Sequence, residues 1–284
     1  MRLLGFMNGG ETFVGRVDGN VVTALAEVSD FYANLSHWRS AGATASGERI
    51  ARNELVLRPP VPPTAKVICV GHNYASHVTE TKRQVSEYPV LFARYASTLI
   101  SDGDDIPVPA VEKGLDWEVE LAAIVGARLY GANDQDCLDG VFGYTALNDV
   151  TARAHQFHTH QFMLGKNPDR SAPIGPVVVT AEEYDPGAVH LETRVNGRTM
   201  QSGTTADMIF KIGPTLAYVN QVMTLNPGDV LATGTPGGIG FRREPPVLMH
   251  AGDLLETTVE GIGTLTNRLV DAWGGSATAN GRRG

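Results

Sequence analysis

The clearest structural signal in this chain is the run Asp116-Trp117-Glu118-Val119-Glu120-Leu121-Ala122-Ala123-Ile124-Val125-Gly126. Its alternating pattern and β-branched residues predict a β-strand. Side chains alternate between the two faces of a strand, so Glu118 and Glu120 share one face while Val119 and Leu121 point to the other. Two carboxylates directed to one partly buried place repel each other unless a cation or protons lie between them. We therefore expect a divalent metal ion at this place.

A third carboxylate follows the next predicted strand. Residues 141–147 form an apolar and aromatic run, and Asp149 comes where that strand ends. Three carboxylates without His or Cys favour a hard ion, so we predict one Mg²⁺ or Mn²⁺ held by Glu118, Glu120 and Asp149. The alternative is that the two glutamates form the solvent face of an edge strand, because alternating charge is common on half-exposed strands.

The composition restricts the class of protein. The chain has 284 residues, with 31 acidic and 23 basic side chains and a net charge of -8. This balance provides no basic surface for nucleic acid or an anionic membrane, so we predict neither partner. The two cysteines, Cys69 and Cys137, belong to no paired motif, and the N-terminus lacks the pattern of a signal peptide. We expect a cytoplasmic protein without a membrane span.

The first part of the sequence predicts a small α/β domain. Turn residues between two β-prone runs at residues 15–22 indicate a hairpin, and residues 25–38 are predicted to be helical. A run of prolines then enforces an extended connector. We predict an N-terminal domain with its connector over residues 1–63, a catalytic domain over 64–272 and a disordered tail over 273–284.

A candidate acid–base pair follows the strand predicted at residues 66–70. His77 and Glu80 are three residues apart, so on a helical turn the carboxylate accepts a hydrogen bond from the imidazole and raises its basicity. The alternative is an ordinary pair of surface residues. Residues 81–88 are polar and unpatterned, and we interpret them as a mobile lid.

Further polar residues follow Asp149. A helix or turn from residue 150 places Arg153 and Gln156 on one face, where they suit a carboxylate substrate. Lys166 belongs to no phosphate-binding motif, and taken alone it is interpreted as a surface charge. Residues 233–240 form a glycine-rich loop without the dinucleotide fingerprint, which predicts close approach of the backbone to a ligand.

The remaining sequence predicts mainly strands and turns. Residues 208–222 form an apolar run of helical length, whereas residues 133–138 are interpreted as a polar connection. Asn196-Gly197 indicates a second hairpin. The whole chain is therefore expected to be mixed α+β and mainly β.

Several motifs together resemble the fumarylacetoacetate hydrolase family. In chain order they are Gly71-x-Asn73-Tyr74-x-x-His77-x-x-Glu80, Asp116-Trp117-Glu118-Val119-Glu120, Gly143-Tyr144-Thr145-x-x-Asn148-Asp149-Val150-x-Ala152-Arg153, Gly228-Asp229 and Thr233-Gly234-Thr235-Pro236-x-Gly238-Ile239-Gly240. The resemblance covers the chain from residue 66 to about residue 270. The sequence is similar in particular to the branch of the family that contains acylpyruvases and 2-hydroxyhepta-2,4-diene-1,7-dioate isomerases.

The resemblance implies a β-sandwich roll core, a small N-terminal α/β domain and a homodimer. It also implies that the His77–Glu80 pair lies on a lid over the substrate and that Lys166 faces the metal, so we predict these three as catalytic residues. The predicted metal ligands stay Glu118, Glu120 and Asp149. The residues predicted to bind the substrate are Tyr74, Arg153, Gln156 and Thr235.

The activity implied is metal-dependent hydrolysis of a carbon–carbon bond in a 2,4-dioxo acid, an acylpyruvate or a fumarylpyruvate-like compound, as in aromatic catabolism. His77 backed by Glu80 would deprotonate a water, and Lys166 would stabilise the oxyanion. The same enolate chemistry also permits an isomerase, a decarboxylase of oxaloacetate or another oxo-dioate, or a dehydratase, and a non-catalytic binder is a further alternative. The chain departs from the family pattern at His72 and Ala154. Neither residue is a predicted metal ligand, so these departures bear on the identity of the substrate more than on metal binding.

Overall fold

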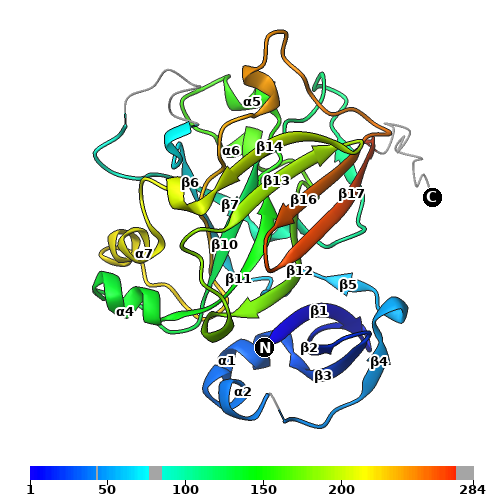
Figure 1. Cartoon of the computed structure of the whole chain (residues 1–284), viewed down its shortest axis with the longest axis vertical. Coiled ribbons are helices and arrows are strands. Elements are labelled where there is room, and N and C mark those ends of the chain that lie inside the picture. Colours follow the sequence, from blue (N-terminus) through cyan, green and yellow to red (C-terminus); the bar gives the residue numbers. More distant parts are fainter. Residues whose placement is uncertain (43, 77–84, 273–284) are drawn as a thin grey trace, which may run out of the picture.

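Strands are the most abundant regular elements in this computed structural model, which describes residues 1–42, 44–76 and 85–272. Within these residues the strands form two sheets, and the helices are few and short (Figure 1). This arrangement confirms the mixed, mainly β fold predicted from the sequence. The predicted tail and the His77–Glu80 pair lie outside the described residues.

The larger sheet has twelve strands among the described residues. Ten of them follow one another in the order β4 (Arg49–Ala51), β3 (Val21–Glu27), β2 (Glu11–Asp18), β1 (Arg2–Asn8), β12 (Ala172–Thr180), β11 (Val141–Asn148), β10 (Val119–Val125), β15 (Val230–Ala232), β6 (Lys66–Gly71) and β7 (Val90–Tyr95). Two short strands lie off this path, β5 (Leu57–Arg58) beside β1 and β8 (Leu99–Ile100) beside β12.

The smaller sheet packs against β10, β11 and β12 of the larger one. Its strand order is β14 (Arg198–Thr204), β13 (His190–Val195), β16 (Leu254–Val259), β17 (Gly263–Asp271) and β9 (Ile106–Val108). The α-helices are α1 (Val28–Ala33), α2 (Leu35–Ala41), α4 (Asp134–Asp139), α5 (Arg153–Gln156), α6 (Met163–Lys166) and α7 (Ile212–Asn220). Short 3₁₀ turns are η1 (Arg52–Glu54), η2 (Ala96–Thr98), η3 (Ala181–Glu183), η4 (Thr205–Asp207) and η5 (Gly240–Arg242).

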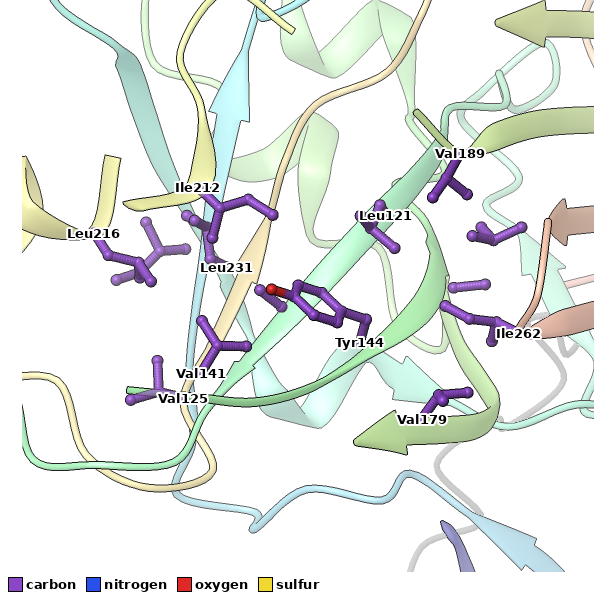
Figure 2. Close-up of a cluster of buried hydrophobic side chains, with 14 of the residues drawn as sticks. Leu121, Val125, Val141, Tyr144, Val179, Val189, Ile212, Leu216, Leu231 and Ile262 are labelled. Atoms are coloured by element: carbon purple, nitrogen blue, oxygen red, sulfur yellow. The ribbon is translucent and has the colours of Figure 1, made fainter. Parts of the chain in front are cut away.

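Strand β10 lies inside the larger sheet, between β11 and β15. All of its residues are buried, and so is Glu118 directly before it, so the alternative that the two glutamates mark an exposed edge strand is wrong. Its odd-numbered residues, including Leu121 and Val125, pack in the apolar cluster around Tyr144 (Figure 2). Ala122 and Ile124 join a second cluster on the opposite face. The even-numbered glutamates share this second face because side chains alternate along a strand.

Strand β1 joins the N-terminal segment to the larger sheet. It pairs antiparallel with β12, with Leu3 opposite Val178. The predicted hairpin is confirmed as β2 and β3, with Asp18 opposite Val21 beside the turn. The division into domains at residue 63 stays a prediction. In the structure the N-terminal strands continue the main sheet and form the lower, blue part of Figure 1.

The helical predictions are confirmed in part. Residues 25–38 contain α1 and most of α2, and residues 208–222 contain α7. The prediction of a polar connection at residues 133–138 is wrong. The Asn133 side chain accepts hydrogen bonds from the backbone N–H groups of Gln135 and Asp136, and this cap begins α4. None of the helices in the described part of the chain is long and apolar enough to cross a membrane.

Candidate metal centre and substrate cavity

Three buried carboxylates meet where β10 begins and β11 ends. Val119 pairs with Asn148, and the backbone N–H of Asp149 donates to the carbonyl oxygen of Glu118 at 2.9 Å. This register brings carboxylate oxygens of Glu118, Glu120 and Asp149 within 4.8 Å of one another. The structure thus brings together the three residues that the sequence predicts as metal ligands.

The side chain of Lys166 lies among these carboxylates. Its Nζ atom is 2.8 Å from Oε2 of Glu118 and 2.5 Å from Oδ2 of Asp149. Burial by itself lowers the pKa of Lys166, but the charges of Asp149 and Glu118 raise it above its usual value. Lys166 is 2% exposed and remains a cation, so its interpretation as a surface charge is wrong.

Asp149 has a second buried cationic partner, Arg94 of β7. The Arg94 guanidinium forms an ion pair with Oδ1 of Asp149. It also donates to the carbonyl oxygen of Val150 at 3.2 Å and to Oγ of Ser171. Arg94 therefore fixes one carboxylate oxygen of Asp149 while the other faces Lys166. Sequence reasoning missed this residue, although an arginine inside an apolar strand is a signal of a buried ion pair.

Arg153 connects the carboxylate cluster to the glycine-rich loop. Its Nη2 atom is 2.6 Å from Oε1 of Glu118 and 2.7 Å from Oδ2 of Asp116, and its Nη1 donates to Oε1 of Gln156 at 2.7 Å. Asp116 also accepts hydrogen bonds from the backbone N–H groups of Gly240 at 2.7 Å and Phe241 at 3.1 Å. The predicted pairing of Arg153 with Gln156 on one face is confirmed. Asp116 was not predicted as a site residue, although it begins the most distinctive motif.

The buried carboxylates of this cluster outnumber its buried cationic side chains, so the cluster favours a bound cation. Its buried charged side chains in the described part of the chain are Asp116, Glu118, Glu120 and Asp149 against Arg94, Arg153 and Lys166. One negative charge therefore remains. Burial, together with the charges of Asp149 and Glu118, raises the pKa of Glu120 well above its usual value. Three carboxylates without nitrogen or sulfur ligands suit a hard ion, so these residues could hold Mg²⁺ or Mn²⁺.

One cavity opens beside the carboxylate cluster. Its polar lining consists of Glu118, Arg153, Gln156, Lys166 and Thr235, with Arg242 and His72 also in the wall. Thr235 is held by a hydrogen bond of 2.9 Å from Nε2 of Gln201 to its Oγ1. Phenylalanine rings form much of the remaining wall. The cavity therefore has a charged region beside the carboxylates and an aromatic region.

A family model described as fumarylacetoacetate (FAA) hydrolase C-terminal matches residues 66–270. The chain belongs to the fumarylacetoacetate hydrolase family. The match covers the candidate metal ligands and all residues that line the cavity.

Similar members of the fumarylacetoacetate hydrolase family carry more than one enzyme name. Oxaloacetate tautomerase YisK of Bacillus subtilis (strain 168) is 36% identical over 262 residues, which are 89% of this chain and 87% of that protein. The mitochondrial oxaloacetate tautomerase Fahd2a of Rattus norvegicus is 39% identical over 223 residues, 78% of this chain and 71% of that protein. The structure of fumarylacetoacetate hydrolase (EaFAH) from psychrophilic Exiguobacterium antarcticum matches with a TM-score of 0.80 and 36% identity, over 96% of this chain and 99% of that one.

The structure places one predicted residue of the fumarylacetoacetate hydrolase motifs away from the cavity. Tyr74 is fully buried in the apolar core, and burial raises the pKa of its hydroxyl. Its neighbour Asn73 anchors the segment, since the Asn73 side chain donates to the carbonyl oxygen of Thr233 at 2.7 Å and accepts from the N–H of Phe210 at 2.7 Å. The predicted contact of Tyr74 with substrate therefore gains no support. Arg153, Gln156 and Thr235 do line the cavity.

Proposed function

We propose that this member of the fumarylacetoacetate hydrolase family interconverts the enol and keto forms of a small 2-oxo acid, and that it depends on Mg²⁺ or Mn²⁺. The observation that carries the proposal is the position of Lys166 and Arg153 beside the carboxylates in one cavity. The similarity to proteins named oxaloacetate tautomerases supports this reaction and makes oxaloacetate the first candidate substrate.

Glu118, Glu120 and Asp149 would hold the metal ion. Such an ion, when bound, polarises a 2-oxo group and neutralises the charge that develops on its oxygen. Arg153 binds a substrate carboxylate beside the ion, because its guanidinium is already oriented by Asp116 and Gln156.

Lys166 stabilises negative charge and does not take up a proton. Asp149 and Glu118 raise its pKa, so the ammonium form persists and donates hydrogen bonds toward the 2-oxo oxygen. Tautomerisation then requires a base that removes the proton from carbon 3 and an acid that supplies a proton to the oxygen. His77 and Glu80 are the predicted pair for this transfer, and they lie outside the described residues.

The main prediction from the sequence, cleavage of a carbon–carbon bond, has less support than its isomerase alternative. Hydrolysis needs a water positioned against the distal carbonyl group and a pyruvate enolate as leaving group. Keto–enol interconversion breaks no bond between carbons and needs neither. The similarity to EaFAH supports hydrolysis as the second candidate reaction. A homodimer, which the family resemblance implies, and a cytoplasmic location, which the cysteines and the N-terminal sequence led us to expect, also remain proposals.

The test uses the full chain, stripped with a chelator and reloaded with Mn²⁺ or Mg²⁺. Enol oxaloacetate is added, the enol absorbance is followed, and pyruvate is measured in the same sample. We expect metal-dependent enol loss at least ~100-fold faster than without protein, and no more pyruvate than the metal alone produces. Pyruvate from oxaloacetate above the amount formed with metal alone would indicate a decarboxylase, and pyruvate from acetylpyruvate would indicate the hydrolase. Rates equal to those of metal alone would overturn the proposal.

A further inference from the structure

Arg242 differs from the other cationic residues of the cavity wall. Arg153 and Lys166 are buried and form ion pairs with the carboxylate cluster. Arg242 is exposed, and its guanidinium takes part in none of the ion pairs among the described residues. Its guanidinium lies beside the ring of Phe241, whose centroid is 5.7 Å from Cζ of Arg242. A guanidinium at the cavity wall without a carboxylate partner is suited to a ligand carboxylate.

Two aromatic pairs line the same cavity. The ring centroids of Phe157 and Phe241 are 5.0 Å apart, and those of Phe92 and Phe162 are 5.7 Å apart. Phe92 also lies 5.3 Å from Nζ of Lys166, so this pair borders the charged region. Apolar rings favour a hydrocarbon segment of a ligand over a hydrated carboxylate. The cavity wall thus combines a charged region at the metal ligands, aromatic rings and a second cation.

The backbone that carries Arg242 is fixed on both sides. Asp116 accepts hydrogen bonds from the N–H groups of Gly240 and Phe241 before it. After it, the Arg243 side chain donates to the carbonyl oxygen of Met200 at 2.6 Å. The backbone position of Arg242 at the cavity is therefore held in part by the same carboxylate that orients Arg153.

We infer that Arg242 is a specificity-determining residue that binds the distal carboxylate of a 2-oxo dioate. The 2-oxo acid end lies at the carboxylate cluster with Arg153, and the carbon chain passes along the phenylalanine rings to the second carboxylate. This inference rests on the proposed function for the position of the 2-oxo acid end. Beyond the proposed function, it predicts that 2-oxo acids with a single carboxylate bind weakly, because they offer no carboxylate to Arg242.

The test is calorimetric titration of the Mn²⁺-loaded full chain with 2-oxoglutarate and with 2-oxopentanoate, which has the same carbon chain without the distal carboxylate. We expect 2-oxoglutarate to bind the unmodified protein on the order of 10-fold more tightly. Arg242→Met should abolish this preference and leave the affinity for 2-oxopentanoate unchanged. Arg242→Lys should keep part of the preference, because it retains the charge and loses the planar fork.

The control variant is Arg128→Met, which removes an exposed arginine near the opposite end of β10. It should bind both ligands like the unmodified protein, and all variants should keep their melting temperature and Mn²⁺ affinity. The inference would be overturned if the unmodified protein bound the two ligands with equal affinity. It would also be overturned if Arg242→Met lowered the affinity for both ligands by the same factor. If the preference and its loss are seen while the enol assay is silent, the proposed reaction fails and the role of Arg242 stands.

Discussion

The Nζ atom of Lys166 lies 2.5 Å from Oδ2 of Asp149, inside a buried group of carboxylates. The lysine supplies part of the positive charge that this group needs in the absence of a metal ion. A bound ion must share the carboxylate oxygens with the ammonium group. Metal binding, stability and the charge of Lys166 are therefore linked.

Lys166→Met should destabilise the metal-free protein more than the metal-loaded one. Removal of one partner from a buried ion pair costs about 3–5 kcal/mol, because the remaining charge is left uncompensated. A divalent ion restores the compensation. The measurement is the melting temperature with chelator and with excess Mn²⁺. The exposed Lys113→Met serves as control and should melt like the unmodified protein in both conditions. Equal losses with and without Mn²⁺ would contradict this account.

Glu120→Gln and Asp149→Asn should each lower the affinity for Mn²⁺ by about 100-fold or more. Each substitution replaces a charged oxygen ligand by a neutral amide in a site whose candidate metal ligands are all carboxylates. Titration calorimetry or the electron paramagnetic resonance signal of free Mn²⁺ provides the affinity. Glu11→Gln, on the exposed end of β2, is the matched control. A variant that binds Mn²⁺ with unchanged affinity would remove its residue from the ligand set.

The affinity for the metal should rise with pH. Burial and the charges of Asp149 and Glu118 raise the pKa of Glu120, so a proton and the metal compete for this carboxylate. The raised pKa also means that the metal-free folded state holds more protons than the unfolded chain above the ordinary carboxyl pKa of about 4.3. Stability in chelator should therefore fall as pH rises from that value through the raised pKa. Melting temperatures across this range, compared with those of Glu120→Gln, test the slope.

Arg94→Met should reduce both stability and metal affinity. Arg94 is the partner of Oδ1 of Asp149, and its loss frees the carboxylate to rotate inside the core. We expect a loss of about 3–5 kcal/mol in the free energy of unfolding with chelator and a 10–100-fold loss of Mn²⁺ affinity. Urea denaturation and calorimetry measure the two effects. Arg94→Lys keeps the positive charge, so it should restore more of the free energy of unfolding than of the Mn²⁺ affinity. Unchanged Mn²⁺ affinity in Arg94→Met would show that Arg94 supports only the fold.

Asp116→Asn should impair catalysis without removing a metal ligand. The neutral amide holds Arg153 and the loop at Gly240 less firmly, so both sides of the cavity lose their orientation. We expect kcat/KM for the enol of oxaloacetate to fall about 10–100-fold while Mn²⁺ affinity changes little. Parallel kinetics and calorimetry separate the two quantities. A large loss of Mn²⁺ affinity would instead assign Asp116 to the ligand group.

The carboxylate cluster could be predicted from the sequence because its geometry is local. Strand alternation alone aligns Glu118 with Glu120. The end of the next strand supplies Asp149, and adjacent strands of a sheet bring strand ends together. The spacing of three residues between Arg153 and Gln156 likewise predicts their contact.

The cations around the cluster could not be predicted in the same way. Arg94 reaches Asp149 across 55 positions of sequence, through a pairing of strands that the local pattern does not reveal. Lys166 lies on a helix of one turn whose position depends on the packing around it. The burial of Tyr74 likewise depends on the segments that close over it. Long-range packing, which sequence periodicity does not encode, decides these positions.

The pairing of β1 with β12 gives the N-terminal strands a protective role. A chain that began at residue 66 would leave the backbone N–H of Thr180 without the carbonyl oxygen of Met1, and Val178 without the strand residue Leu3 opposite it. Open strand edges rich in valine associate with strands of other molecules. The first strands thus act as a cover against aggregation, and a shortened enzyme would be limited by its solubility even if its cavity stayed intact.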